Sequence, residues 1–198
     1  MNLTRTRRSA IALGALAIAA AAHAQGTDKL KVGLMLPYSG TYTALGVAIE
    51  NGVRLYVDEQ RGKLGGREIE FVKVDDESDP AKATENVNKL IRRDKVDVIV
   101  GTVHSGVAMA MARAAKESNT LLIVPNAGSD AVTGQMCATN IFRSSFSNWQ
   151  SSYGMGTVAA AQEKKKTAVT ITWKYSAGDE MANAFKEGFE KEGGKVVK

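Results

Sequence analysis

The 198-residue sequence has few residues able to build metal centres or disulfides, since it contains one cysteine and two histidines. A structural zinc site needs about four ligands, and the lone Cys137 is either free or paired outside this sequence. Runs long enough to cross a bilayer are also missing. The longest apolar run, residues 11–22, would rise only about 18 Å as a helix, against a hydrocarbon core of about 30 Å. We therefore expect no metal, no cofactor and no membrane insertion of the exported chain.

The first residues have the order of a secretory signal peptide. Three arginines among the first eight residues precede the apolar run, and Ala22 and Ala24 supply a small-residue cleavage site ahead of Gln25. We expect residues 1–24 to be removed on export. Their removal takes away three arginines and no acid, so the formal net charge falls from +5 to +2. A nucleic-acid-binding protein would normally keep a clustered basic surface, and we expect no nucleic-acid partner.

After Gln25 the sequence alternates short apolar runs with helical patterns, which is typical of an α/β fold with a parallel sheet. The expected strands are Leu30–Leu36, Glu68–Val74, Val96–Val100, Leu121–Val124, Ile141–Arg143, Ala168–Ile171 and Lys195–Val197. The expected helices are Leu45–Tyr56, Ala83–Ile91, Val107–Lys116, Tyr153–Gln162 and Met181–Glu190. For the second helix, Asp79 is the expected N-cap and Pro80 the first helical residue.

The helical pattern lapses between Pro125 and Gln150 and then restarts. We therefore expect a doubly wound α/β lobe over residues 25–146 and a second α/β lobe from residue 147. Two strands and two helices within residues 147–198 are too few to bury a core like that of the first lobe. The sequence thus predicts a complete or nearly complete first lobe, a truncated second lobe and a fragment of a longer protein.

Ligands of open parallel sheets bind beyond the carboxyl ends of the strands. One loop at that edge, Gly101–Gly106, leads directly into a helix whose first amides and dipole favour a carboxylate. A second loop, Pro125–Ser129, offers further amides. Taken singly, each loop fits ordinary turn chemistry better, but Tyr42, Trp173 and Tyr175 would add an apolar wall. The predicted ligand-binding residues are Ser39, Tyr42, His104, Ser105, Asn126, Ala127, Gly128, Trp173 and Tyr175.

Catalytic motifs of related sheets are missing from the sequence. No dinucleotide fingerprint or phosphate loop follows the first strand, and no G-x-S-x-G elbow surrounds Ser105. Asp75 and Asp76 follow the second strand, where we interpret them as loop acids at the cleft edge rather than as a phosphoacceptor pocket. The sequence therefore predicts a binding protein and not an enzyme.

Several stretches, in this order and spacing, resemble the periplasmic type I solute-binding proteins of ABC importers, in the branch for branched-chain amino acids (Leu/Ile/Val) and related carboxylates. They are Pro37–Gly40, Gly62–Gly66, Asp75–Pro80, Gly101–Gly106, Pro125–Ser129 and Phe142–Ser144, within a similarity that covers residues 30–198. The resemblance implies a periplasmic protein whose two lobes close over a ligand and deliver it to an inner-membrane ABC permease. It also implies that Ser105 is a hydroxyl donor to the ligand carboxylate, assisted by amides of residues 126–128. We expect a monomer.

The identity of the ligand stays open at this point. Residues 146–150 and Thr172–Tyr175 are similar to members that bind aromatic acids, which need flat aromatic walls. Leucine-type ligands need an apolar pocket and an acceptor for the ammonium group, and a sugar binder would use paired carboxylates. A further alternative is an extracellular ligand-sensing domain of a receptor with the same fold.

Overall fold

Strands and helices alternate along residues 29–198, the part of the chain that this computed structural model describes. The predicted signal peptide lies outside these residues. The strands are β1 (Leu30–Leu36), β2 (Lys63–Leu64), β3 (Arg67–Asp75), β4 (Val98–Val100), β5 (Leu121–Val124), β6 (Ile141–Arg143), β7 (Thr167–Ala168) and β8 (Lys195–Val196). The helices are α2 (Thr43–Glu59), α3 (Pro80–Asn88) with the π-helical turn η1 (Lys89–Arg93), α4 (Ser105–Ser118), α5 (Asp130–Thr133), α6 (Asn148–Ala161) and α7 (Ser176–Lys191).

Six strands form one sheet in the order β2-β3-β1-β4-β5-β6. Its strands are parallel except β2, which pairs antiparallel with β3. From β1 the chain goes first to β3 on one side and later to β4 on the other. The loops after β1 and β4 therefore diverge and leave a crevice at the topological switch point. This arrangement confirms the predicted doubly wound α/β fold.

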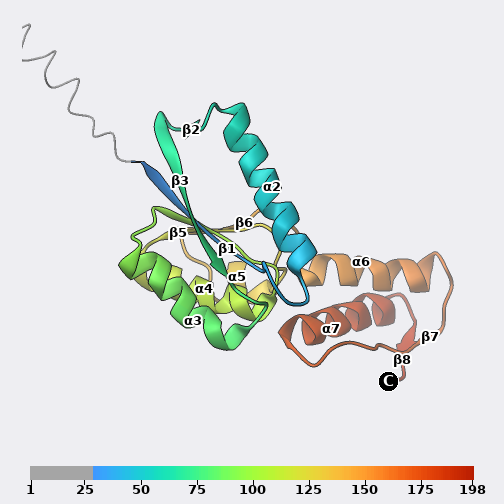
Figure 1. Cartoon of the computed structure of the whole chain (residues 1–198). Helices are drawn as coiled ribbons and strands as arrows, with labels where there is room; N and C mark the ends of the chain where they lie inside the picture. Colours follow the sequence, from blue (N-terminus) through green and yellow to red (C-terminus); the bar gives the residue numbers. More distant parts are fainter. Residues whose placement is uncertain (1–28) are drawn as a thin grey trace, which may run out of the picture.

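The sheet has a core on each face because alternate residues of a strand point to opposite sides. Leu34 and Leu36 belong to the cluster that packs with α2, whereas Met35 belongs to the cluster beneath α3 and α4 (Figure 1). Full burial of one such side chain is worth about 1.5–3 kcal/mol. At β5 and β6 the α2 side is open: Leu121 and Phe142 remain exposed there.

Two helix starts show how local chemistry sets the boundaries. The Asp79 side chain accepts a hydrogen bond from the Ala81 amide at 2.9 Å, and Pro80 is the first residue of α3, as predicted. Helix α6 begins at Asn148, before the predicted Tyr153. A capping box explains the early start, because Ser147 Oγ accepts from the Gln150 amide and Gln150 Oε1 accepts from the Ser147 amide.

Residues 147–198 form a smaller unit beside the sheet, in which α6 and α7 pack along each other (Figure 1). The helices approach closely through glycines: a Cβ on Gly156 would lie 2.2 Å from the Phe185 carbonyl oxygen. Next to them, β7 and β8 form a two-stranded parallel sheet. The predicted strand Ala168–Ile171 was too long, since β7 ends at Ala168 and Ile171 is 94% exposed. Within the described chain β8 is the one strand paired with β7, in register with Thr167 and Ala168, and one further hydrogen bond joins the Thr170 amide to the Lys198 carbonyl at 2.8 Å. The division into lobes at residue 147 stays a prediction.

Candidate functional site

Three helices begin with an aromatic ring near the switch point of the sheet. Tyr42 is the N-cap residue of α2, His104 that of α4 and Tyr175 that of α7. The centroids of the Tyr42 and His104 rings lie 6.2 Å apart, and those of His104 and Tyr175 lie 5.2 Å apart. The fold thus brings together three of the predicted site residues from distant parts of the sequence, and we call them the aromatic group.

His104 is held as a neutral hydrogen-bond donor. Its Nδ1 accepts a hydrogen bond from the Gly106 amide at 3.0 Å, so the proton of the neutral ring resides on Nε2. Burial lowers the pKa of His104, and the nearby charge of Asp79 opposes this shift only in part. At neutral pH the ring therefore offers an N–H group without adding positive charge.

Tyr175 is likewise neutral. Burial, together with a hydrogen bond to Tyr42, raises its pKa to about 12. The pair joins α7 to the loop that precedes α2. Its two phenol groups add polar atoms to an otherwise apolar wall.

A pocket of about 340 Å³ lies beside the aromatic group, lined by Tyr42, Ile171, Thr172, Trp173 and Tyr175. Its volume falls within the range of about 300–1,000 Å³ typical of small-molecule sites. Trp173 is 66% exposed, so its ring is accessible from the pocket side rather than packed in a core. The lining is suited to a flat, mostly apolar guest.

Ser105 is the first residue of α4 and is only 3% exposed. Within residues 29–198 its hydroxyl has no hydrogen-bond partner. The first amides of α4 and the positive end of its dipole lie next to it. A hydroxyl beside a helix N-terminus is a favourable environment for an anion.

The loop 125–129 is tied to its surroundings. The Ala127 amide donates to the Thr102 carbonyl at 3.0 Å and is thus occupied in this arrangement. The Gly128 carbonyl accepts from the Asn148 amide at 2.7 Å, and the carbonyl of the exposed Asn126 accepts from the Ser145 hydroxyl at 3.4 Å. A ligand role for these three loop residues stays a prediction.

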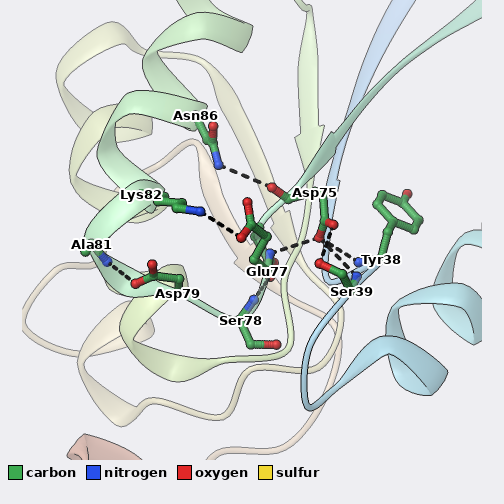
Figure 2. Close-up of polar contacts among 10 residues, drawn as sticks. Tyr38, Ser39, Asp75, Glu77, Ser78, Asp79, Ala81, Lys82 and Asn86 are labelled. Carbon is green, nitrogen blue, oxygen red and sulfur yellow. Dashed lines mark hydrogen bonds and ion pairs between the residues drawn. The ribbon is translucent and has the colours of Figure 1, made fainter.

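Ser39 is directed at Asp75 (Figure 2). Its hydroxyl donates to Asp75 Oδ2 at 2.7 Å, and the amides of Tyr38, Ser39 and Glu77 donate to Oδ1. Burial alone would raise the pKa of Asp75, but these hydrogen bonds outweigh it and lower the pKa. This contact orders the segment that leads to Tyr42, and direct ligand binding by Ser39 stays a prediction.

Asp76 connects two of the rim loops, a contact that the sequence did not predict. The side chain is fully buried, accepts from the Ser78 amide at 2.8 Å and also accepts from the Thr102 hydroxyl. Burial raises the pKa of Asp76 in spite of these hydrogen bonds. Since Thr102 in turn binds Ala127, the loops after β3, β4 and β5 are joined in one network.

A second contact missed by the sequence lies where the loop 125–130 meets α6 and α7. The Glu180 carboxylate accepts hydrogen bonds from the Ser129 hydroxyl, the Asp130 amide and the Asn148 side chain. Elsewhere, Cys137 is exposed as a free thiol. In the described part of the chain, no group of His, Cys, Asp or Glu side chains is arranged to hold a metal ion. No helix in that part is long and apolar enough to cross a membrane.

The sheet order is that of an open, doubly wound α/β protein, and ligands of such sheets bind beyond the carboxyl ends of the strands. The sequence profile of the periplasmic binding proteins matches residues 29–198, and the chain belongs to this family. This confirms the expected resemblance. The family consists of binding proteins rather than enzymes.

The chain matches about one half of the length of its relatives. The chain is 32% identical over 189 residues to Leu/Ile/Val-binding protein homolog 6 of Brucella abortus, covering 94% of this chain and 48% of the relative. It is 58% identical to an ABC transporter solute-binding protein from R. palustris solved with benzoate, with a TM-score of 0.83 over 86% of this chain and 47% of that one. A solute-binding protein from Rhodopseudomonas palustris BisB5, solved with 3,4-dihydroxybenzoic acid, is 34% identical, with a TM-score of 0.78 over 85% and 46% of the two chains.

The chain therefore spans about half the length of these relatives. Both solved structures are solute-binding proteins of ABC transporters. Neither of these two structures favours the alternative that the chain is the extracellular ligand-sensing domain of a receptor.

Proposed function

We propose that this chain is the ligand-capturing part of a periplasmic solute-binding protein that delivers an aromatic carboxylate to an ABC importer. The observation that carries the proposal is the aromatic group of Tyr42, His104 and Tyr175 beside the 340 Å³ pocket. The 58% identity to a benzoate-bound solute-binding protein supports the same ligand class.

In this proposal the ligand carboxylate lies at the N-terminus of α4. The Ser105 hydroxyl and amide and His104 Nε2 donate hydrogen bonds to it, and such charge-assisted bonds are the strong ones. The ligand ring packs against Tyr42, Trp173 and Tyr175. A micromolar dissociation constant corresponds to about −8 kcal/mol, which a few such bonds and an aromatic wall supply.

Capture is proposed to occur by closure of two lobes, the first formed by residues 25–146 and the second begun by residues 147–198. Tyr42 and His104 belong to the first lobe and Tyr175 to the second, so the aromatic group lies where the lobes face each other. Segments that cross between lobes absorb the rotation. The rest of the second lobe, and cover for the open sheet face at Leu121 and Phe142, are assigned to a longer chain. The exported protein is proposed to act as a periplasmic monomer with an inner-membrane permease.

A branched-chain amino acid is the second candidate ligand, favoured by the name of the Brucella relative. Such a ligand carries an ammonium group that needs a carboxylate or carbonyl acceptor. The residues that line the pocket within 29–198 are aromatic, aliphatic or Thr172. This lining fits the ring of an aromatic acid better than the charged end of leucine.

Calorimetry of the full-length protein with benzoate and with leucine tests the proposal. We expect micromolar binding of benzoate and a loss of about 1.5–3 kcal/mol in the Ser105→Ala variant. Ser118→Ala is the matched control, because Ser118 lies at the far end of α4 and its hydroxyl binds the Ala114 carbonyl. Binding of leucine without benzoate would establish the second candidate. Unchanged affinity in Ser105→Ala would remove Ser105 from the site.

A further inference from the structure

One carboxylate joins the first turns of α7 to the sheet-side loop at the site. Glu180 Oε2 accepts from Asn148 Nδ2 at 2.6 Å and from the Asp130 amide at 3.3 Å, and Oε1 accepts from the Ser129 hydroxyl at 3.1 Å. Ser129 and Asp130 lie about fifty residues before Glu180 and belong to the loop and short helix next to β5. Glu180 thus connects the two predicted lobes directly.

The chemistry of this connection suits a carboxylate. The three groups around Glu180 all act as donors, and the Ser129 side chain is fully buried. An ionised carboxyl is acceptor-only and can serve all three. Removing the carboxylate would leave these part-buried donors without an acceptor, which costs more than the bonds themselves.

The loop 128–130 also accepts hydrogen bonds from the start of α6, so each side of the junction supplies acceptors to the other. Asp130 Oδ1 accepts from the Trp149 amide at 3.2 Å, so an acid of the sheet-side loop caps the N-terminus of α6. The Asn148 amide donates to the Gly128 carbonyl at 2.7 Å. The approach is close, since a Cβ on Gly128 would lie 2.3 Å from Asn148 Oδ1. We call residues 128–130, Asn148, Trp149 and Glu180 the interlobe clasp.

The clasp acts on the aromatic group through α7. Tyr175 is the N-cap of this helix, five residues before Glu180, and its carbonyl accepts from the Asp179 amide. A helix turn is rigid compared with a loop, so anchoring Glu180 fixes the direction in which Tyr175 points. Tyr175 is the member of the aromatic group that contacts His104 and Tyr42 from the α7 side.

We infer that Glu180 is a positioning residue, whose carboxylate fastens α7 to the loop 128–130 and thereby holds Tyr175 against His104 and over the bound ligand. This inference rests on the proposed function, because the gain from a fixed Tyr175 is a longer-lived complex with an aromatic acid. The anchoring itself exists without ligand and is measurable without it.

The test compares Glu180→Ala with Glu190→Ala in the full-length protein. Glu190 is also on α7 and also accepts a hydrogen bond, from the Val196 amide at 3.3 Å, but this contact lies within residues 147–198 and touches no residue of the clasp. In the ligand-free state, electron-spin resonance gives the distance between two spin labels. One is attached to Cys137 in the predicted first lobe and the other to a cysteine introduced by Glu192→Cys in the predicted second lobe. Calorimetry gives the affinity for benzoate, and stopped-flow fluorescence gives its release rate.

We expect Glu180→Ala to widen the label distance distribution, to weaken benzoate binding about tenfold or more, and to do so through faster release. Glu190→Ala should leave the distance and the release rate at their wild-type values, even where it lowers the unfolding midpoint by a similar amount. A wild-type distance distribution and release rate in Glu180→Ala would overturn the inference.

Two further outcomes keep the result interpretable. If Glu180→Ala does not fold, Ser129→Ala removes a contact to Glu180 from the sheet-side lobe and should show the same widening, whereas an unchanged distance overturns the inference. If the wild-type protein binds no benzoate, the proposed function fails on that result alone. The label distances in the ligand-free variants then decide whether Glu180 holds the lobes.

Discussion

Replacing Gly46 with alanine should destabilise the protein, although alanine is the better helix former by about 1 kcal/mol. Gly46 lies in α2, where a Cβ would come 2.1 Å from the Pro37 carbonyl oxygen. Ordinary contact begins at 3.4 Å, so helix and loop would have to separate by about 1.3 Å, the difference between these two distances. Overpacking of this kind costs about 1–3 kcal/mol and occasionally more. Because the obstacle is backbone that cannot rotate away, we expect a net loss of about 2 kcal/mol.

Gly52 provides the matched control in the same helix. A Cβ there meets no atom within 4 Å, so Gly52→Ala should stabilise the protein by about 0.5–1 kcal/mol. Urea unfolding of both variants measures the difference, which should be about 3 kcal/mol with opposite signs. Since the Gly46 amide donates to the Tyr42 carbonyl at 3.0 Å, only Gly46→Ala should also weaken benzoate binding. Equal or greater stability of Gly46→Ala relative to wild type would refute the reasoning.

Three other perturbations test separate parts of the structure. Asp79→Ala removes the cap of α3 and should cost about 1 kcal/mol in urea unfolding, with no change expected in Asp79→Asn. Phe189→Ala, at a fully buried position of α7 whose ring packs against Phe185 and Gly194, should cost about 3–5 kcal/mol; a loss below 1 kcal/mol would contradict tight packing there. For His104, whose pKa is lowered by burial, the unfolded chain binds a proton before the folded one as pH falls below about 6.5. Stability should therefore drop as pH falls through that range, and a His104→Gln variant with an unchanged slope would disprove this origin.

Sequence reasoning succeeded where local chemistry decides the structure. Strand β1 coincides with the predicted Leu30–Leu36 because an uninterrupted apolar run is what a strand covered on both faces requires. The start of α3 follows from Asp79 and Pro80 alone. The start of α6 was open to the same reasoning, since Ser147 and Gln150 have capping-box spacing, a signal that the predicted start at Tyr153 overlooked.

Features that depend on distant partners were not predictable. Val169 to Ile171 have the composition of a strand, but the regular pairing with β8 covers Thr167 and Ala168, and beyond them one hydrogen bond, from the Thr170 amide to the Lys198 carbonyl, continues it. Glu180 carries no motif, and its importance arises from donors 32 to 51 residues away. The aromatic group was predictable in part. The sequence analysis named Tyr42, His104 and Tyr175 as site residues, but only the fold shows that their rings lie close together.

The position of the aromatic residues at helix N-caps has a consequence for how the proposed site could come to bind a different ligand. Neither Tyr42 nor Tyr175 makes a side-chain cap hydrogen bond, so the helices they precede do not depend on these side chains for their first turn. Both residues are only partly buried and stand outside the two cores that hold the sheet together. In the proposed site, selectivity can consequently change by exchange of a few residues at helix starts, while the two cores of the sheet keep the fold unchanged.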